Sequence, residues 1–194
     1  MSKLIFETKR KLFHIAALIY LLAYWIIQNL YSKKIAILFL LSILIFLIII
    51  EYFRVVRKEK IPIFHILFRE QEENSIGGQV YYFIGMILAL SLFDFQIALA
   101  AILMMTLGDA AAAIFGIAFG KHWIKSIKET AWEGIAAEFI VDIIIAYFII
   151  GNWYIMIPMA LTATLVETIF PHVDDNLTIP IFAGFIAQTI TLLL

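Results

Sequence analysis

Long apolar runs separated by short polar joins make up most of this sequence. They predict seven helices, near residues 13–31, 35–53, 76–93, 95–119, 134–150, 153–169 and 177–194. A helix that crosses a bilayer needs about 20 mostly apolar residues, and each run approaches that length. A shorter apolar stretch, residues 61–68, predicts a segment that lies in the membrane interface. The pattern indicates an all-α, polytopic membrane protein of about seven transmembrane helices, with one domain over residues 1–194.

The composition agrees with this interpretation. Hydrophobic residues make up 64% of the chain and the mean hydropathy is +1.01, whereas soluble proteins are roughly 45–50% apolar. The chain has no cysteine, which excludes disulfides, thiolate metal sites and cysteine nucleophiles. The amino terminus lacks the pattern of a removable signal peptide, so we expect the first helix to remain in the mature protein.

Basic residues are concentrated on one side of the predicted topology. Of the 14 Lys and Arg residues, only Lys33 and Lys34 fall in a join on the opposite side. The others lie at the amino terminus and in the joins after helices two and four, which share one side of the membrane, so the positive-inside rule predicts a cytoplasmic amino terminus. Most acidic and amide residues outside the apolar runs gather on the same side. We therefore expect an integral cell-membrane protein whose active site faces the cytoplasm.

Asp109 is an ionisable residue within the fourth predicted helix. Such residues are costly in a membrane and are functional candidates by default. Small residues recur at every fourth position around it, at Gly108, Ala112, Gly116 and Gly120, so another backbone or a nucleotide's phosphates can approach this stripe closely. The alternative is a simple helix-packing seam whose one buried carboxylate pairs with a lysine.

Further acidic residues follow in the fifth helix and in the last cytoplasmic join. Glu138 and Asp142 are four apart and share a helix face, while Glu133 lies at the helix mouth. The last join contains further hard oxygen ligands, which suit Mg²⁺, at Glu167, Asp174, Asp175 and Asn176. Two alternatives stay open. Glu138 or Asp142 pairs with a buried base or a serine-type donor elsewhere, or the Asp-Asp-Asn run only caps the last helix.

Basic side chains supply a candidate phosphate clamp. Arg10 and His14 share one helical face at the membrane boundary, and Lys11 adjoins them. The loop after the glycine stripe adds Lys121, Lys125 and Lys128. The alternative is that the amino-terminal cations only anchor the helix to lipid phosphates. No Walker-type loop, kinase glycine loop or His-Glu-x-x-His motif is present, which excludes the usual soluble phosphotransfer machinery and that zinc site.

Together, five stretches resemble the CTP-dependent lipid-alcohol kinases, a family that includes dolichol kinase, phytol kinase and the fungal-type diacylglycerol kinase. They run in family order along the chain: RKLFH at 10–14, GGQVYYFIG at 77–85, GDAAAAIFGIAFGKH at 108–122, EG at 133–134 and ETIFPHVDDNLTIP at 167–180. The family's essential residues correspond to Arg10, Lys11, Asp109 and Gly116. One departure is Thr130, where the family usually has lysine three residues before the Glu-Gly pair.

The resemblance implies transfer of the γ-phosphate of CTP, with Mg²⁺, to the hydroxyl of a polyprenol, an isoprenoid alcohol or a diacylglycerol. The mechanism expected from phosphoryl-transfer chemistry relies on positioning and charge neutralisation. Glu133 would take the proton of a lipid hydroxyl that arrives laterally from the inner leaflet. The expected metal ligands are Asp109, Glu167, Asp174 and Asp175. The expected phosphate-binding residues are Arg10, Lys11, His14, Gly108, Gly116, Lys121, Lys128 and Asn176.

Two other functions fit parts of the pattern. A CTP:phosphatidate-type cytidylyltransferase, to which the kinase family is distantly similar, has a related glycine-aspartate helix and acidic carboxyl-terminal motif. A small ion-coupled transporter would use Asp109 and Asp142 as coupling-ion sites, but the internal repeats common in carriers are missing. The expected partners are the nucleotide, the lipid alcohol and membrane lipids, with no nucleic acid. The sequence leaves open which alcohol is used and whether the protein forms a homodimer.

Overall fold

The computed structural model describes residues 3–58, 75–124, 130–169 and 173–194. These residues are almost entirely helical, and the extended structure among them is a single isolated bridge between Trp123 and Ala131. The helices are α1 (Lys3–Ala16), α2 (Leu18–Leu30), α3 (Lys33–Glu51), η1 (Tyr52–Val56), α4 (Gly78–Leu92), α5 (Phe95–Leu103), η3 (Met104–Gly108), α6 (Asp109–Phe119), α7 (Trp132–Ile149), α8 (Trp153–Ile169) and α9 (Asp175–Leu193).

Several of these helices continue into one another, so the described residues form seven rods. α1 runs into α2 through Ala17, which keeps helical backbone angles. α3 ends in the π-helical turn η1, and α5 passes through the π-helical turn η3 into α6. The seven rods agree with the seven predicted ranges to within a few residues, except that the first rod starts about ten residues early.

The early start of the first rod has a simple cause. Residues 3–12 are too polar to be recognised from hydropathy, but Lys, Glu and Arg are good helix formers. An ion pair three residues apart, between Glu7 and Arg10, also supports the helix. The prediction therefore found the apolar part of this rod and missed its polar extension, which carries Arg10 and Lys11.

The all-helical, membrane-type prediction is confirmed in its coarse form. Helices long and apolar enough to cross a membrane occupy Glu7–Leu30, Lys33–Val56, Phe95–Phe119 and Asp175–Leu193. α4 and α8 are apolar but shorter, and α7 contains three acidic residues. The described residues thus give four candidate spans by length and composition. Seven crossings and a cytoplasmic amino terminus stay predictions, and the predicted interfacial segment at 61–68 lies outside the described residues.

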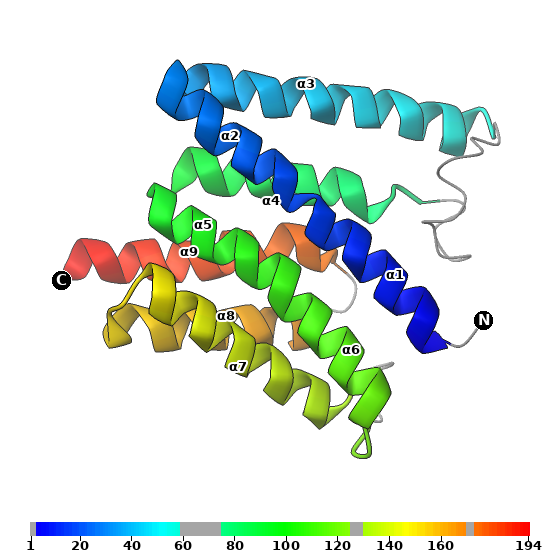
Figure 1. Cartoon of the computed structure of the whole chain (residues 1–194), viewed down its shortest axis with the longest axis vertical. Coiled ribbons are helices and arrows are strands. Elements are labelled where there is room, and N and C mark those ends of the chain that lie inside the picture. Colours follow the sequence, from blue (N-terminus) through cyan, green and yellow to red (C-terminus); the bar gives the residue numbers. More distant parts are fainter. Residues whose placement is uncertain (1–2, 59–74, 125–129, 170–172) are drawn as a thin grey trace.

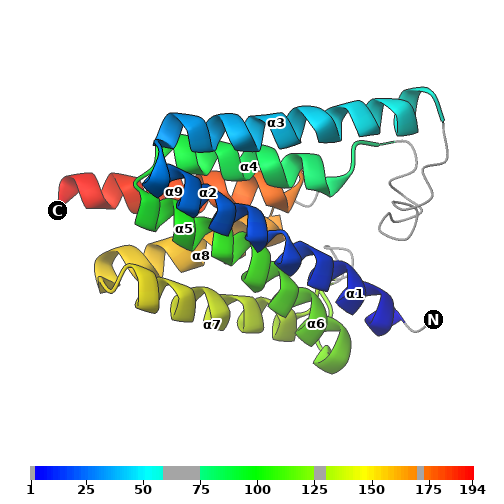
Figure 2. The same cartoon turned by 45° about the horizontal axis from the view of Figure 1, so that its top comes forward.

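α9 lies at the centre of the bundle, where it packs against α4, α5 and α8 (Figure 1). α6 and α7 pack side by side, while α2 and α3 form an outer pair that contacts the rest through α4. Turning the molecule shows the same order of helices (Figure 2). The starts of α1, α4, α7 and α9 and the ends of α3, α6 and α8 lie toward one end of the bundle. The carboxyl terminus lies at the other end.

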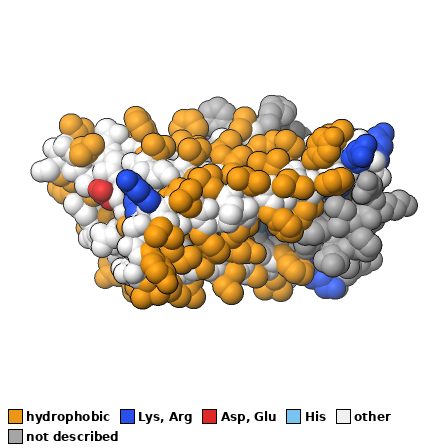
Figure 3. Space-filling model, turned by 90° about the horizontal axis from the view of Figure 1, so that it is seen from above, with side chains coloured by type: hydrophobic (Ala, Val, Ile, Leu, Met, Phe, Trp, Pro, Cys, Tyr) orange, Lys and Arg blue, Asp and Glu red, His pale blue; other side chains and the backbone are white. Residues whose placement is uncertain are grey.

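The outer surface has the pattern expected of a protein that faces lipid. Hydrophobic side chains cover the middle of the face over α3, with Lys and Arg side chains toward its two ends (Figure 3). Large apolar residues are well exposed along the outer rods, among them Ile19, Trp25, Leu38 and Phe46. In water a continuous apolar belt of this kind would drive aggregation. In a bilayer it is the favoured surface.

The small-residue stripe on α6 forms a tight seam with α7. A Cβ atom added at Gly134 would lie 2.7 Å from the Ala112 carbonyl oxygen and 3.3 Å from the Gly116 Cα. At Gly108, an added Cβ would overlap the Asp142 carboxylate, so this glycine makes room for an acidic side chain. The packing-seam alternative is therefore correct for the glycines. Its second part, a buried carboxylate that pairs with a lysine, also describes Asp109, which pairs with Lys11. Asp109 in addition lines a cavity, which a packing seam does not require.

Candidate functional site

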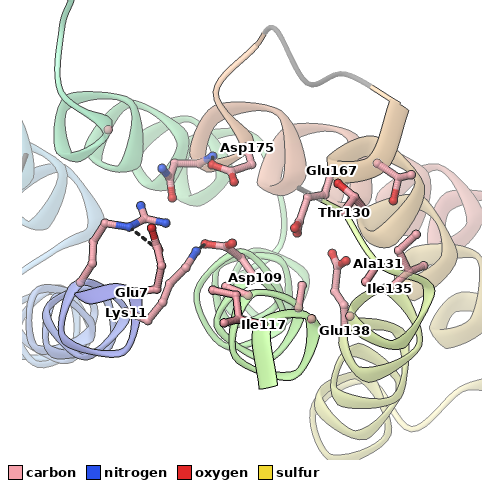
Figure 4. Close-up of a pocket in the computed structure, with 18 of the residues that line it drawn as sticks. Glu7, Lys11, Asp109, Ile117, Thr130, Ala131, Ile135, Glu138, Glu167 and Asp175 are labelled. Atoms are coloured by element: carbon pink, nitrogen blue, oxygen red, sulfur yellow. Dashed lines mark hydrogen bonds and ion pairs between the residues drawn. The ribbon is translucent and has the colours of Figure 1, made fainter. Parts of the chain in front are cut away.

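A polar cavity of about 300 Å³ opens at the end of the bundle where α1, α6, α7, α8 and α9 meet. Figure 4 shows acidic side chains converging on this space from α6, α7, α8 and α9, with Lys11 reaching in from α1. Small and apolar residues of α6 and α7 form part of its wall. The described residues that line it are Glu7, Arg10, Lys11, Gly78, Asp109, Ala112, Ala113, Gly116, Ile117, Thr130, Ala131, Gly134, Ile135, Glu138, Glu167, Thr168, Asp174, Asp175 and Asn176.

Asp109 and Lys11 form a buried ion pair on one side of the cavity. The Lys11 side chain is 2% exposed and the Asp109 side chain 7%. Asp109 is the first residue of α6, directly after the π-helical turn η3. Turns of this kind are frequent at functional sites, because the extra residue alters where the following side chains point. The predicted intramembrane carboxylate therefore faces a charged partner and an open space.

Arg10 is the second cation at this side. Its Nε donates a hydrogen bond to Glu7 Oε2 at 2.9 Å, and it also lies near the carboxylates of Asp109 and Asp175. Arg10 and Lys11 are the only basic residues that line the cavity among the described residues. Their anionic neighbours hold both cations in place at the cavity wall. This arrangement is suited to binding an anion that displaces or shares those neighbours.

The start of α9 supplies two carboxylates and an amide. Asp174 is the N-cap, and its Oδ1 accepts hydrogen bonds from the Asn176 backbone N at 3.1 Å and from Asn176 Nδ2 at 2.8 Å. Asp175 Oδ1 accepts from the same backbone N at 2.8 Å, and its side chain reaches the cavity. The capping alternative is therefore correct for Asp174. Burial, together with the neighbouring Asp175 carboxylate, raises the pKa of Asp174 to about 7, so a cation at this position would favour its ionised form.

A third group of carboxylates lies on the α7 and α8 side. Glu138 and Asp142 are 1% and 0% exposed, and Glu138 faces Glu167 across the cavity (Figure 4). Glu138 Oε1, Glu167 Oε2 and both Asp142 oxygens are buried without a hydrogen-bond partner in the described part of the chain. Asn176 Oδ1 is in the same state. Burying oxygens in this way is costly unless a ligand or a proton satisfies them.

These oxygens fit Mg²⁺ in a particular way. In the described ranges no three His, Asp or Glu side chains are grouped closely enough to form a complete metal cage. Mg²⁺ usually binds one or two carboxylates together with waters and substrate phosphates. The donor set is therefore compatible with an ion that shares the site with a phosphate substrate. It is not compatible with a fully protein-ligated ion.

The start of α4 is held next to this site by a buried glutamate. Glu51, at the end of α3, is 4% exposed. Its Oε2 accepts from the Gly77 backbone N at 3.1 Å, and its Oε1 accepts from Gln79 Nε2 at 3.0 Å. Arg54 donates to Glu51 Oε2 at 2.6 Å and to the Ser75 carbonyl at 2.5 Å. This network fixes the backbone just before Gly78, which lines the cavity.

The structure brings together most of the predicted site residues. The predicted residues that line the cavity are Arg10, Lys11, Asp109, Gly116, Glu167, Asp174, Asp175 and Asn176. Gly108 instead packs against Asp142, and His14 lies against Tyr82 with ring centroids 4.9 Å apart. Lys121 is exposed at the end of α6 and does not line the cavity. Lys125 and Lys128 lie outside the described residues.

Glu133, the predicted proton acceptor, lies at the outer mouth of α7. Its Oε1 is 2.7 Å from His122 Nδ1, and its Oε2 accepts from the His122 backbone N at 3.3 Å. It therefore joins the loop after α6 to the start of α7. It is not among the residues that line the cavity.

One acidic residue of the cavity, Glu7, received no role from the sequence. Glu7 precedes Arg10 by three residues and Lys11 by four, so all three share one face of α1. That spacing was the available signal, but Glu7 lies in a polar stretch that hydropathy did not assign to a helix. Glu138 was recognised as a candidate. Only the packing of α7 against α8 decides that it faces Glu167 and the cavity.

The sequence is similar to several known proteins. It is 31% identical over 191 residues to an uncharacterized protein of Rickettsia prowazekii, covering 91% of this chain and 90% of that protein. It is 30% identical over 135 residues to a wheat (Triticum aestivum) protein named probable phytol kinase, chloroplastic, covering 60% of this chain and 45% of that protein. It is 30% identical over 81 residues to a Schizosaccharomyces pombe protein named CTP-dependent diacylglycerol kinase 1, covering 42% of this chain and 37% of that protein. No protein-family model and no solved structure matches the chain.

The extent of these matches limits what each of them shows. The Rickettsia prowazekii match spans nearly both full lengths, so it establishes a family relationship. The chain spans less than half the length of the two named kinases. These two matches support the resemblance to lipid-alcohol kinases, at low identity.

Proposed function

We propose that this chain, which belongs to the same family as the Rickettsia prowazekii protein and is similar to proteins named phytol kinase and CTP-dependent diacylglycerol kinase, is a lipid-alcohol kinase. The proposed reaction transfers the γ-phosphoryl group of CTP to the hydroxyl of a polyprenol, an isoprenoid alcohol or a diacylglycerol. The observation that carries the proposal is the buried Lys11–Asp109 pair on the wall of a carboxylate-rich cavity. A structural ion pair needs no such cavity beside it.

Arg10 and Lys11 are the proposed triphosphate-binding residues. Both cations line the cavity on α1, and each is paired with a carboxylate. Phosphate oxygens are strong acceptors for charge-assisted hydrogen bonds, so they would compete with Glu7 for Arg10 and with Asp109 for Lys11. Gly116 would let the ligand approach the backbone of α6. Asn176 would donate or accept a hydrogen bond from the opposite wall.

Asp109, Asp174 and Asp175 are the carboxylates from which the Mg²⁺ ligands are proposed to come, one or two at a time, with water and phosphate oxygens completing the set. When bound, the ion would neutralise phosphate charge and so favour the charge distribution of the transition state. Asp109 would be released for this role when Lys11 turns to the phosphates. The exchange would keep Lys11 and Asp109 each paired with an opposite charge before and after nucleotide binding, which avoids the large cost of leaving either ion buried and unpaired.

The acceptor hydroxyl would enter between helices from the lipid side. Its oxygen forms the new bond to the γ-phosphorus, the bond to the β-phosphate oxygen breaks, and CDP leaves. The hydroxyl proton passes to a carboxylate. Glu133 lies outside the cavity, where its Oε1 is 2.7 Å from His122 Nδ1. We therefore assign the proton transfer to one of the carboxylates that line the cavity. The basic residues at this end of the bundle favour a cytoplasmic active site.

The test uses CTP labelled at the γ- or the α-phosphate, Mg²⁺ and purified protein in detergent. Geranylgeraniol, phytol, longer polyprenols and diacylglycerol are offered separately, and phosphatidate is the control substrate. We expect lipid labelled from the γ-position only, and a loss of at least about 100-fold in Asp109→Asn. Lipid labelled from the α-position would instead identify a cytidylyltransferase. No label from either position into any acceptor would contradict the proposal.

A further inference from the structure

The α7 and α8 side of the cavity contains carboxylates with no basic partner among the described residues. Glu138 and Glu167 line the cavity from the two helices and point toward each other (Figure 4). Glu138 is 1% exposed, and one oxygen of each carboxyl group has no hydrogen-bond partner in the described part of the chain. Both cations that line the cavity, Arg10 and Lys11, are engaged on the α1 side.

Charge balance makes this side of the cavity unusual. Six carboxylates line the described cavity and only two cationic side chains oppose them. A triphosphate in the same space would add several more negative charges. One divalent ion at Asp109, Asp174 and Asp175 would leave the Glu138 side without compensation. Like charges brought this close inside a protein repel strongly unless a cation or a proton lies between them.

We propose that Glu138 and Glu167 together bind a second divalent cation of the Mg²⁺ class, separate from the ion proposed at Asp109, Asp174 and Asp175. This inference deepens the proposed function and rests on it for the phosphate that would complete the ion's ligands. Two carboxyl groups that line the cavity and point toward each other, each with one buried oxygen that has no hydrogen-bond partner among the described residues, match the way in which Mg²⁺ binds proteins. Two metal ions would also clamp the attacking and leaving oxygens of a phosphoryl transfer.

Asp142 is a buried acidic residue near this site that does not contact the proposed ion. It lies one turn deeper than Glu138 on α7, is 0% exposed and has two unpartnered oxygens among the described residues. It does not line the cavity, so we assign it no contact with the ion. Its carboxyl group also lies near enough to Glu138 and Glu167 to interact with them electrostatically, which would favour a cation between those two residues.

The binding test does not depend on catalysis. Mn²⁺ is titrated into purified, nucleotide-free protein in detergent and free Mn²⁺ is counted by electron paramagnetic resonance, with and without inorganic triphosphate as a probe. We expect two bound ions in the wild type with triphosphate. Glu138→Gln and Glu167→Gln should each abolish the binding of one ion or lower its affinity by at least tenfold. Asp109→Asn should lower the affinity for the other ion. Asp94→Asn removes an acid between α4 and α5 at the opposite end of the bundle, so it should bind as the wild type does.

Several outcomes would overturn the second site. It is wrong if Glu138→Gln and Glu167→Gln bind Mn²⁺ like the wild type, because the two carboxyl groups then share a proton. It is also wrong if the wild type binds only one ion and Asp109→Asn loses it. Far-ultraviolet circular dichroism checks the fold of each variant, and Glu138→Asp, which keeps the carboxylate, should recover binding in part. If two ions bind and no lipid is phosphorylated, the proposed kinase function fails and the metal site stands.

Discussion

Lys11 on α1 and Asp109 on α6 form an ion pair that is almost completely buried. The two residues are 98 positions apart in sequence, and the pair joins the first rod to α6 at the wall of the cavity. Burying two charges costs several kcal/mol per ion, which their mutual attraction must offset. The pair therefore has measurable consequences for stability as well as for catalysis.

Removal of only one partner of this pair should be strongly destabilising. Lys11→Met leaves Asp109 buried without its cation, and we expect the free energy of unfolding to fall by about 3–5 kcal/mol. The double variant Lys11→Met, Asp109→Leu should recover most of that loss and still lack phosphotransfer. The measurement is unfolding in mixed detergent and SDS micelles, followed by circular dichroism. Additive losses in the double variant would mean that the two side chains do not interact in the folded protein.

The α6–α7 seam offers a matched pair of glycine substitutions. Gly134→Ala places a methyl group 2.7 Å from the Ala112 carbonyl oxygen, so the helices must separate and stability should fall by about 1–3 kcal/mol. Gly116→Ala meets its nearest neighbour at 3.7 Å, and its stability should stay within about 0.5 kcal/mol of the wild type. Gly116 lines the cavity, so this stable variant should still lose phosphotransfer. Equal losses of unfolding free energy in the two variants would show that Gly134 is not the closest contact between α6 and α7.

Asp174 and Asp175 should have different roles: Asp174 caps α9, and Asp175 is a proposed metal ligand. Asp174→Ala removes the N-cap of α9 and should cost about 1 kcal/mol of stability, whereas Asp174→Ser keeps a cap and should restore it. Asp175→Asn should leave stability nearly unchanged and lower phosphotransfer at saturating lipid. Thermal unfolding and initial rates are measured on the same preparations. Full activity in Asp174→Ser would show that Asp174 is a cap without a further role.

Glu51 should act on the site through the backbone of α4. Glu51→Ala leaves the Gly77 N–H and the Gln79 amide without their acceptor, and we expect a stability loss of about 1–3 kcal/mol. Displacement of Gly78 should then raise KM for the nucleotide more than it lowers kcat. Glu51→Gln retains one acceptor oxygen for Gly77 and should recover part of the affinity. An unchanged KM in Glu51→Ala would remove the proposed link between α3 and the cavity.

The sequence predicted the helices because long apolar runs have few other solutions in a membrane. It also placed Asp109, Arg10, Lys11 and Asp175 in one site, since each stands out against its surroundings or belongs to a family motif. All four line the cavity, although their chemical roles stay proposals. The predictions were weakest where the outcome depended on the rotation of a helix.

Glu133 and Glu138 illustrate that limit. They lie five residues apart on α7, close to one and a half turns, so they project in different directions. The Glu-Gly motif drew attention to Glu133, which contacts His122 outside the cavity. Which face of α7 points inward is decided by the Gly134–Ala112 seam and by the packing of α8, and neither contact can be read from the order of residues alone.

The π-helical turn η3 lets one rod bury apolar residues along α5 and also point Asp109, on α6, toward Lys11. A π-helical turn contains about one residue more than an α-helical turn, and each added residue rotates the following side chains by about 100° relative to the preceding ones. α5 can therefore keep Ala98 and Ala101 buried in the apolar interior, while α6 directs Asp109 toward Lys11. Deletion of a single residue between positions 104 and 108 would convert the π-helical turn to a regular α-helical turn. The side chains of α6 would then lose their added rotation relative to those of α5. The carboxylate would then turn away from its lysine although every residue of the cavity was still present in the chain.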